Sequence, residues 1–578
     1  MELLSPLTLV VDTTAAEFPS LGQDCVLSLL RQLPLACALR LRHVSKDFAA
    51  AAEARQMENE ALELAHSDRL SDEILRRLLA QSPVLKTLSI GGCDHFKSEC
   101  LQSAISKVQT LHTLELSSTS IDAACFALLW CSLPNLTSLD VDNCHDIDSS
   151  ELDRYLARPT LERCAARIQR LSIASCRLLS VRTVSLLCRS CADRLTDLDA
   201  SGYDELCSED VRAISSACPS LRRVRLVESE RLDDACCTHL ASNCARLVAI
   251  ELSWCEEVGT TGLVQLIRAC PKLEECELRC CSNASARHVM RALSSHAPEL
   301  RILNLNRCDD SYEDDGVEDE DDEAKPSATL LASRDEVASA APHLFSALGL
   351  AVTMPCRLIS PIAQCSTKLQ WLDVGWMADL IDDAACALLL ASLPQLRVLS
   401  LEGCKRLSDC ALMPLLPRKS WLALSDRPQL KEEAEARAEA AAEEKEAHVA
   451  AAFPATADCG AALLRLNCSW ADGITTKALH AVINSHAERR RQVLARRIER
   501  RLEAALSRGD LHSHGPHEHS LLLPSRAEQL LCLDYFGACW GTVDGKPSHC
   551  PLEDLPGKAL TGWVAAYHGA EDEPFGVS

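Results

Sequence analysis

The sequence predicts an α/β solenoid in which short parallel strands alternate with helices, and three repeating features indicate this. A central apolar position recurs along the chain, helix-capping residues follow it after 8 to 10 residues, and cysteines fall at two phased places, after the strand and at the helix end. Self-similarity at a period of roughly 20–50 residues is the signature of stacked repeats. A chain of 578 residues is also too long for one ordinary globular core.

The strand half of the repeat is an apolar segment that ends in cysteine in many repeats, as in LKTLSIGGC (Leu85 to Cys93) and LVAIELSWC (Leu247 to Cys255). Most steps between central apolar residues are 25 to 27 residues, with one of 32, and the phase resumes at Leu372 and Leu399 after an insertion. These residues are Leu62, Leu88, Leu114, Leu139, Leu171, Leu198, Val224, Ile250, Cys276 and Leu303. Neighbouring units therefore stack so that their strands form a parallel sheet.

The helix half begins at a residue whose side chain can accept from free N–H groups of the first turn. Apolar residues at helical spacing follow, such as Val211 and Ile214, and a Cys-Pro pair such as Cys218-Pro219 ends the helix. The predicted N-caps are Ser71, Asp122, Asp148, Ser208, Asp233 and Ser408.

The 32 cysteines do not form the pattern of a secreted disulfide scaffold, which is a small chain behind a signal peptide. Glu2 stands where a signal peptide is basic, and no segment has the ~20 continuous apolar residues of a spanning helix. Buried free cysteine acts as a small apolar residue. We therefore expect free thiols in the cytoplasm, the nucleus or both, and no membrane association.

This spacing resembles the cysteine-containing leucine-rich repeat found in many F-box proteins, over roughly Leu62 to Cys404. The resemblance implies a horseshoe-shaped leucine-rich-repeat solenoid. The segment Leu21 to Glu53, directly before the first repeat, resembles the F-box itself. Asp24, Leu30, Leu33, Pro34, Val44, Ser45, Lys46 and Phe48 match that pattern. It departs at Phe18-Pro19-Ser20-Leu21, which is out of register, and lacks the acidic residue before Leu39.

The resemblance implies a substrate-recognition subunit of a cullin-RING (SCF-type) ubiquitin ligase, with a Skp-type adaptor and a cullin as partners. The residues it assigns to adaptor binding are Leu29, Leu30, Leu33, Pro34, Leu41, Val44 and Phe48. The alternative is a leucine-rich-repeat scaffold or regulator without ligase association, whose N-terminal helices seal the first repeat.

The residues flanking the inner leucines point to the concave surface, because side chains alternate along a strand. Tryptophan and arginine are the types that most often dominate binding energy. The predicted substrate-binding residues are Arg223, Arg225, Glu251, Trp254, Arg279, Trp371 and Trp376. The three guanidinium groups near Trp254 favour a partner with acidic or phosphorylated groups and an apolar anchor. The alternative is a face that is simply solvated.

Composition shifts divide the chain into a tail, F-box-like helices, repeats, an acidic insertion, further repeats, an Ala/Glu-rich insertion, an irregular repeat with a basic helix, and a His-rich loop with a degenerate cap. Their bounds are 1–18, 19–56, 57–308, 309–330, 331–425, 426–458, 459–508 and 509–578. The acidic insertion is either a solvated loop or a docking site for a basic partner. The basic helix is either solvated or a contact for import or anionic surfaces.

Composition also excludes several functions. A net charge of −24 argues against nucleic-acid binding, which needs a basic surface. Gly-rich phosphate loops and Ser-His-Asp arrangements are lacking, and the cysteines fall at buried positions where thiolates are disfavoured. The histidines and cysteines of the C-terminal region lack paired CxxC spacing. We therefore predict neither catalytic residues, nor a cofactor, nor a metal.

Overall fold

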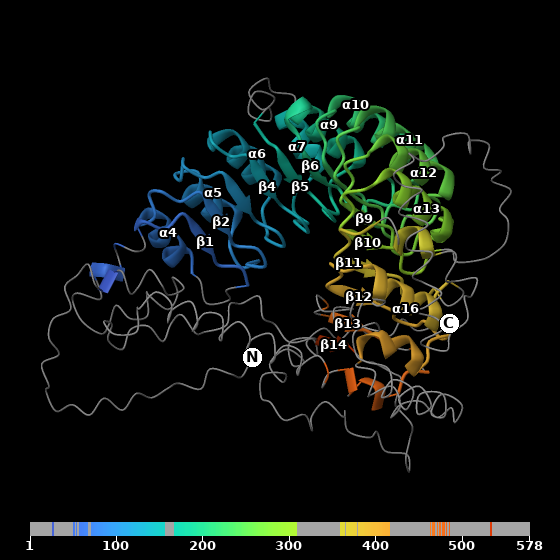
Figure 1. The fold of residues 1–578 in the computed structure, drawn as a ribbon. Helices are drawn as coiled ribbons and strands as arrows, with labels where there is room; N and C mark the ends of the chain where they lie inside the picture. Colours follow the sequence, from blue (N-terminus) through green and yellow to red (C-terminus); the bar gives the residue numbers. More distant parts are fainter. Residues whose placement is uncertain are drawn as a thin grey trace, which may run out of the picture. The chain divides into compact units, whose positions relative to one another are not determined.

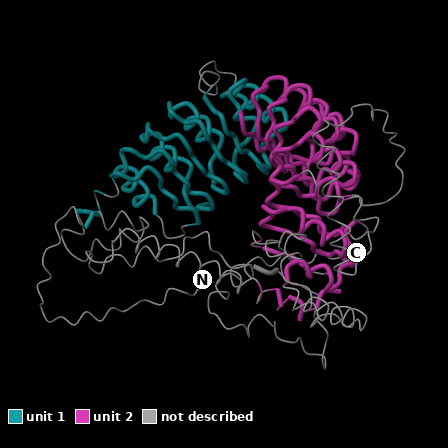
Figure 2. Tube along the Cα trace, viewed as in Figure 1, with its two compact units in different colours: residues 1–195 teal, residues 196–578 magenta. Residues whose placement is uncertain are grey.

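The computed structural model describes residues 71–156 and 167–308, parts of 26–66, 359–416 and 463–485, and the backbone of 532–534. The chain divides into two compact units, residues 1–195 and 196–578 (Figure 2). Each unit is a stack of strand-helix repeats, with three-residue strands in chain order and helices along one side of the sheet (Figure 1).

In the first unit the five strands β1 to β5 pair in parallel, each with the next. The strands are β1 (Ala61–Glu63), β2 (Thr87–Ser89), β3 (Thr113–Glu115), β4 (Ser138–Asp140) and β5 (Arg170–Ser172). The helices between and after them are α4 (Asp72–Ala80), α5 (Ser98–Ile105), α6 (Ala123–Ser132), α7 (Ser149–Leu156) and α9 (Val181–Cys191), followed by the 3₁₀ turn η2 (Ala192–Arg194).

In the second unit β6 to β14 pair in the same way. The strands are β6 (Asp197–Asp199), β7 (Arg223–Arg225), β8 (Ala249–Glu251), β9 (Glu275–Glu277), β10 (Ile302–Asn304), β11 (Trp371–Asp373), β12 (Val398–Ser400), β13 (Arg465–Asn467) and β14 (Cys532–Asp534). The helices are α10 (Ser208–Ala217), α11 (Asp234–Asn243), α12 (Thr260–Ala269), α13 (Ala286–His296) and α16 (Asp383–Ser392), with the 3₁₀ helix η3 (Asp409–Leu415).

From β1 to β13 the central residue of each strand lies in the core. Leu88, Leu114 and Leu303 are completely buried, and each such side chain contributes about 2 kcal/mol by leaving water. Leu303 pairs with Leu372 across the insertion between β10 and β11. The insertion therefore leaves the register unchanged, and the flanking residues of β8 to β12 form continuous columns on the opposite face of the sheet.

The helix starts follow the predicted caps, with one correction. The side chains of Ser71, Asp122, Asp233 and Ser408 each accept from a backbone N–H of the first turn. Ser208, predicted as an N-cap, is instead the first helical residue. Its hydroxyl lies 2.5 Å from Oδ1 of Asp233, the cap of the next helix. It lies one position too late to cap its own helix because the preceding Cys207 has the extended backbone of the cap.

A second set of hydrogen bonds joins the repeats through their cysteines. The thiol of Cys255 donates to the carbonyl oxygen of Leu226 at 3.1 Å, and that of Cys281 donates to Leu252 at 3.1 Å. Cys144, Cys176 and Cys308 make the same contact with the preceding repeat. Where a cysteine follows the strand, it fills the buried position with a small side chain and also joins neighbouring repeats.

Burial raises the pKa of these thiols, to about 11 for Cys144 and about 12 for Cys255 and Cys276. Since the thiolate is the nucleophile, we expect Cys144 and Cys255 to stay unmodified by iodoacetamide at pH 8 until the protein unfolds. The half-buried Cys207 and Cys410 serve as controls that label first. Mass spectrometry of the alkylated peptides measures this, and equal labelling rates for Cys255 and Cys410 in the folded protein would contradict the buried layer.

Candidate functional site

The predicted substrate-binding residues fall in the second unit, on two separate features. Arg223 and Arg225 flank the buried Val224 in β7, Glu251 ends β8 and Trp371 begins β11, all on the strand face. Trp254, Arg279 and Trp376 lie in the turns that follow the strands instead. The structure therefore divides the residues that the sequence groups together.

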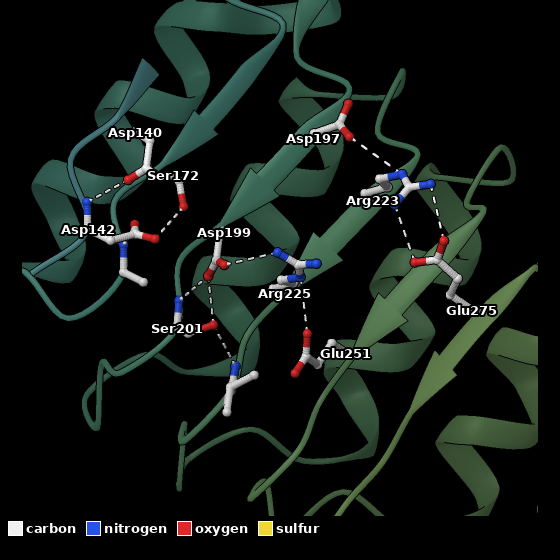
Figure 3. A network of polar contacts seen from close by, with 12 residues as sticks. Asp140, Asp142, Ser172, Asp197, Asp199, Ser201, Arg223, Arg225, Glu251 and Glu275 are labelled. Carbon is white, nitrogen blue, oxygen red and sulfur yellow. Dashed lines mark hydrogen bonds and ion pairs between the residues drawn. The ribbon is translucent and has the colours of Figure 1, made fainter. Parts of the chain in front are cut away.

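Both arginines of β7 lie between carboxylates of neighbouring strands (Figure 3). The Arg225 guanidinium is 3.1 Å from Glu251 on one side and 3.8 Å from Asp199 on the other. Arg223 lies 3.7 Å from Asp197 and 3.2 Å from Glu275. Each positive charge is thus matched by two negative ones. The arginines are internal partners of the carboxylates, which argues against the acidic or phosphorylated partner that the sequence favours.

Arg223 contacts a strand that is not its neighbour because the residue between them is small. Ala249 of β8 separates Arg223 from Glu275, which pairs with Ala249 in register. Its methyl group leaves a shallow hollow, open to solvent, whose walls include Arg225, Glu251 and Glu277. Charged groups therefore surround an apolar floor of Ala249 and Ile250.

Glu251 and Glu277 are directly paired residues on β8 and β9, and both are half-buried. Burial, and then the other carboxylate, raises the pKa of Glu251, while Arg225 lowers it. Burial also raises the pKa of Glu277; Arg225 lowers it, and Glu275 and Asp373 raise it further. Like charges directly opposite on neighbouring strands destabilise a sheet. This pair is therefore held at a cost to stability.

Two tryptophans occupy the turn position that takes a left-handed backbone. Gly92, Gly202 and Gly403 have positive φ there, while Trp254 and Trp376 adopt φ of 63° and 61°. A residue with a side chain is disfavoured in this region by ~1–2 kcal/mol. The Arg279 guanidinium lies 5.9 Å from the Trp254 ring centre, and Arg307 lies 4.8 Å from that of Trp376.

The two tryptophans differ in what remains exposed. Trp254 is 40% exposed, as is expected of a contact residue. Trp376 is half-buried and less exposed than Trp254. A Cβ added at Gly403 would lie 2.5 Å from the Trp376 ring. Trp376 thus packs between Gly403 and Arg307, which gives it a structural role at the edge of the sheet. Trp371, 38% exposed, is the tryptophan on the strand face.

A second polar network, in the first unit, serves only to hold a turn. Asp142 accepts from the Ser172 hydroxyl at 2.8 Å and from the backbone N–H of Ala174 at 2.7 Å (Figure 3). Asp140 accepts from the backbone N–H of Asp142 at 3.0 Å. Both carboxylates are occupied by neighbouring groups of their own unit, so this network offers little to a partner.

Sequence reasoning missed three members of the site. Asp197 and Glu275 hold Arg223, and Ala249 makes the hollow. The sequence could have indicated them by position. Each of the three stands one residue before a central apolar residue, as Arg223 does, and so lies in the same row across the strands. A small residue, Ala249, between charged residues at this position is the feature that indicates the hollow.

The predicted adaptor-binding residues lie outside the described residues: Leu29, Leu30, Leu33, Pro34, Leu41, Val44 and Phe48. The predicted acidic, Ala/Glu-rich, basic and His-rich segments do so as well. Within the described ranges no group of three His, Cys, Asp or Glu could hold a metal ion. In the same ranges none of the helices has the length and apolar character to cross a membrane.

No protein-family profile matches the chain. Among solved structures it is similar to the yeast Rad7 and Elc1 complex at 17% identity and a TM-score of 0.48, covering 67% of this chain and 89% of the other. An internalin of Listeria monocytogenes matches at 12% identity and a TM-score of 0.32, covering 66% and 88%. The leucine-rich-repeat protein LegL7 of Legionella pneumophila matches at 15% and 0.31, covering 44% and 86%. The strand-helix repeats described above form a leucine-rich-repeat solenoid.

The carboxylate pair predicts a specific pH dependence of stability. Because the folded state raises the pKa of Glu277 above its unfolded value, ionisation disfavours folding at neutral pH and has no effect below the unfolded pKa. Glu277→Gln should therefore raise the thermal midpoint at pH 7 and leave it unchanged at pH 3.5. Glu209→Gln on α10, where the exposed carboxylate pairs with Arg212, is the control and should give no gain. A lower midpoint for Glu277→Gln at pH 7 would show that the Glu277 carboxylate stabilises the fold, contrary to this expectation.

Proposed function

We propose that the protein is the substrate-recognition subunit of an SCF-type cullin-RING ubiquitin ligase. The observation that carries the proposal is the order of the chain, an F-box-like segment directly before cysteine-containing repeats with a polar, tryptophan-bearing sheet face. The N-terminal helices would bind a Skp-type adaptor, and through it a cullin. The repeats would hold a protein for ubiquitination and subsequent degradation.

In this role the protein contributes position and carries out no chemistry itself. Holding a substrate lysine beside a charged conjugating enzyme turns a bimolecular encounter into an effectively intramolecular one. The described cysteines, which a conjugation reaction could otherwise use, are mostly buried, and burial raises the pKa of such thiols as Cys125 and Cys244 to about 12. Free thiols in such number fit the reducing cytoplasm or nucleus.

A second candidate is a leucine-rich-repeat scaffold or regulator that binds a partner without any ligase. Specific observations favour it: Val26, Ala51 and Ala52, which lie in helical segments before β1, are each at most 2% exposed. Such burial is what helices that seal the end of a solenoid require. The departures of the F-box-like segment from the usual pattern fit this candidate as well.

Adaptor binding separates the two candidates. Changing Leu29, Leu30 and Val44 together to aspartate should weaken binding of a recombinant Skp-type adaptor by more than 10-fold, because it places charge on the apolar face that the F-box resemblance assigns to the adaptor. Biolayer interferometry measures this with the full chain, and thermal unfolding shows whether the repeats stay folded.

The control variant is Val84→Asp with Leu178→Asp, at positions of the first unit that are 42% and 51% exposed. It adds similar charge to the repeats and should leave adaptor binding unchanged. If the unaltered protein does not bind the adaptor, the ligase proposal is wrong and the scaffold candidate replaces it.

A further inference from the structure

The strand face of the second unit carries an excess of negative charge after its internal ion pairs are counted. From β6 to β11 the flanking positions hold six carboxylates and two arginines, which leaves four negative charges in excess. These residues are Asp197, Asp199, Arg223, Arg225, Glu251, Glu275, Glu277 and Asp373. Among the ion pairs of the described residues, Glu277 and Asp373 have no arginine or lysine partner.

Apolar side chains lie on the same face, beside this charge. In the column that begins with Arg223, the next positions are Ala249, Glu275, Ile302 and Trp371, each paired in register with its neighbour. Ile302 and Trp371 are adjacent, and Trp371 is 38% exposed. An exposed tryptophan beside an aliphatic side chain on an otherwise charged face is the composition of an interface anchor.

The second column of the face contains Glu277 and Asp373, the two carboxylates without a basic partner among the ion pairs of the described residues. It runs Glu251, Glu277, Asn304, Asp373 across β8 to β11. The Asp373 carboxylate is fixed by the Gly375 backbone N–H at 2.9 Å and the Asn306 amide at 3.1 Å. The Asp373 carboxylate therefore keeps one orientation, and its negative charge lies beside the adjacent side chains of Trp371 and Ile302.

We infer that this face, over β8 to β11, binds an extended segment of a partner protein that carries lysine or arginine side chains next to an aliphatic or aromatic one. The cationic groups contact Glu251, Glu277 and Asp373, and the apolar side chain packs on Ile302 and Trp371. The inference rests on the proposed function in one respect only, that the partner is the protein to be ubiquitinated.

Spacing supports an extended segment that crosses the strands. Parallel strands lie ~4.8 Å apart, so Glu277 and Asp373, two strands apart, are separated by ~10 Å. In a segment with the polyproline II conformation, which is extended and has three residues per turn, side chains three residues apart lie on the same side and are separated by ~9 Å. A basic pair at that spacing places one charge on each carboxylate.

Electrostatics excludes the opposite chemistry on this face. An acidic or phosphorylated segment would meet Glu251 and Glu277, whose own repulsion already raises the pKa of Glu251. The guanidinium groups of Arg223 and Arg225 are held between carboxylates on both sides. A cationic segment instead relieves the repulsion, since binding supplies the positive charge that the pair lacks.

A selection with defined peptides tests the inference. A random library of nine-residue peptides displayed on phage is selected on the full chain, then depleted on Glu251→Gln/Glu277→Gln/Trp371→Ala. Retained peptides should be enriched in lysine and arginine with one aliphatic or aromatic residue. The most enriched peptide, labelled with fluorescein, is then titrated by fluorescence anisotropy.

Its dissociation constant should rise at least 10-fold with Glu251→Gln/Glu277→Gln and at least 10-fold with Trp371→Ala. It should also rise steeply with salt. The matched control, Glu205→Gln/Glu209→Gln, removes one carboxylate from the turn before α10 and one from the first turn of α10, and should change the dissociation constant less than 2-fold. Circular dichroism confirms that each variant is folded.

Three outcomes overturn the inference: enrichment of aspartate or glutamate, the absence of any enriched sequence that the variant loses, and equal weakening by the α10 control. Adaptor binding by the same variants should be unchanged. If the chain selects basic peptides but does not bind the adaptor, this inference stands and the ligase proposal is wrong. If it binds the adaptor but selects no basic peptides, the ligase proposal stands and this inference is wrong.

Discussion

One interior layer, repeated at an almost constant step, is the constraint on which the rest of this structure depends. A strand-centre apolar residue such as Leu303 is buried in each repeat from β1 to β13, and a cysteine such as Cys308 is buried after the strand in many of them. The Cys308 thiol donates to the carbonyl oxygen of Leu278 in the repeat before it, at 3.0 Å. Both side chains pack against the neighbouring repeats, because protein interiors are close-packed. The layer therefore sets both the spacing and the register of the sheet.

The functional face follows from that register. Since every strand presents its flanking residues at the same height, Arg225 is aligned with Asp199 and Glu251 by the backbone pairing alone. The arginine forms its ion pairs without any specialised loop. The same alignment places Glu277 beside Glu251, and their repulsion is an arrangement that stability alone would not retain. The face is thus ordered by the core and charged in a way that suits a cationic partner.

Much of this architecture is predictable from the sequence because it depends on periodic positions. The strand centres from Leu62 to Leu399 and most helix caps need only the phase of apolar residues and the chemistry of Asp and Ser side chains. The predicted cap Ser208 lies one place after the actual cap, Cys207, since a cysteine and a serine stand side by side at that start. Contacts between side chains of different repeats are harder to predict from the sequence, because they depend on the lengths of those side chains in three dimensions.

Two examples show that limit. Arg223 reaches Glu275 across the short side chain of Ala249, so its positive charge is already matched by carboxylates on both sides. Trp376 has the composition of a binding residue, but its ring lies against Gly403 and under Arg307. The sequence places both residues on the correct element. Their partners come from neighbouring repeats and become visible only when the repeats are stacked.

Ser229 allows the most direct test of the interior layer. It stands where other repeats have cysteine, is completely buried, and its hydroxyl has no hydrogen-bond partner among the described residues. Ser229→Cys restores the residue that the layer requires, while Ser229→Ala only removes the unsatisfied hydroxyl. Urea unfolding should show a gain of about 1 kcal/mol for the cysteine variant and a smaller one for alanine. A cysteine variant less stable than the unaltered protein would contradict the claim that this layer holds the repeats in register.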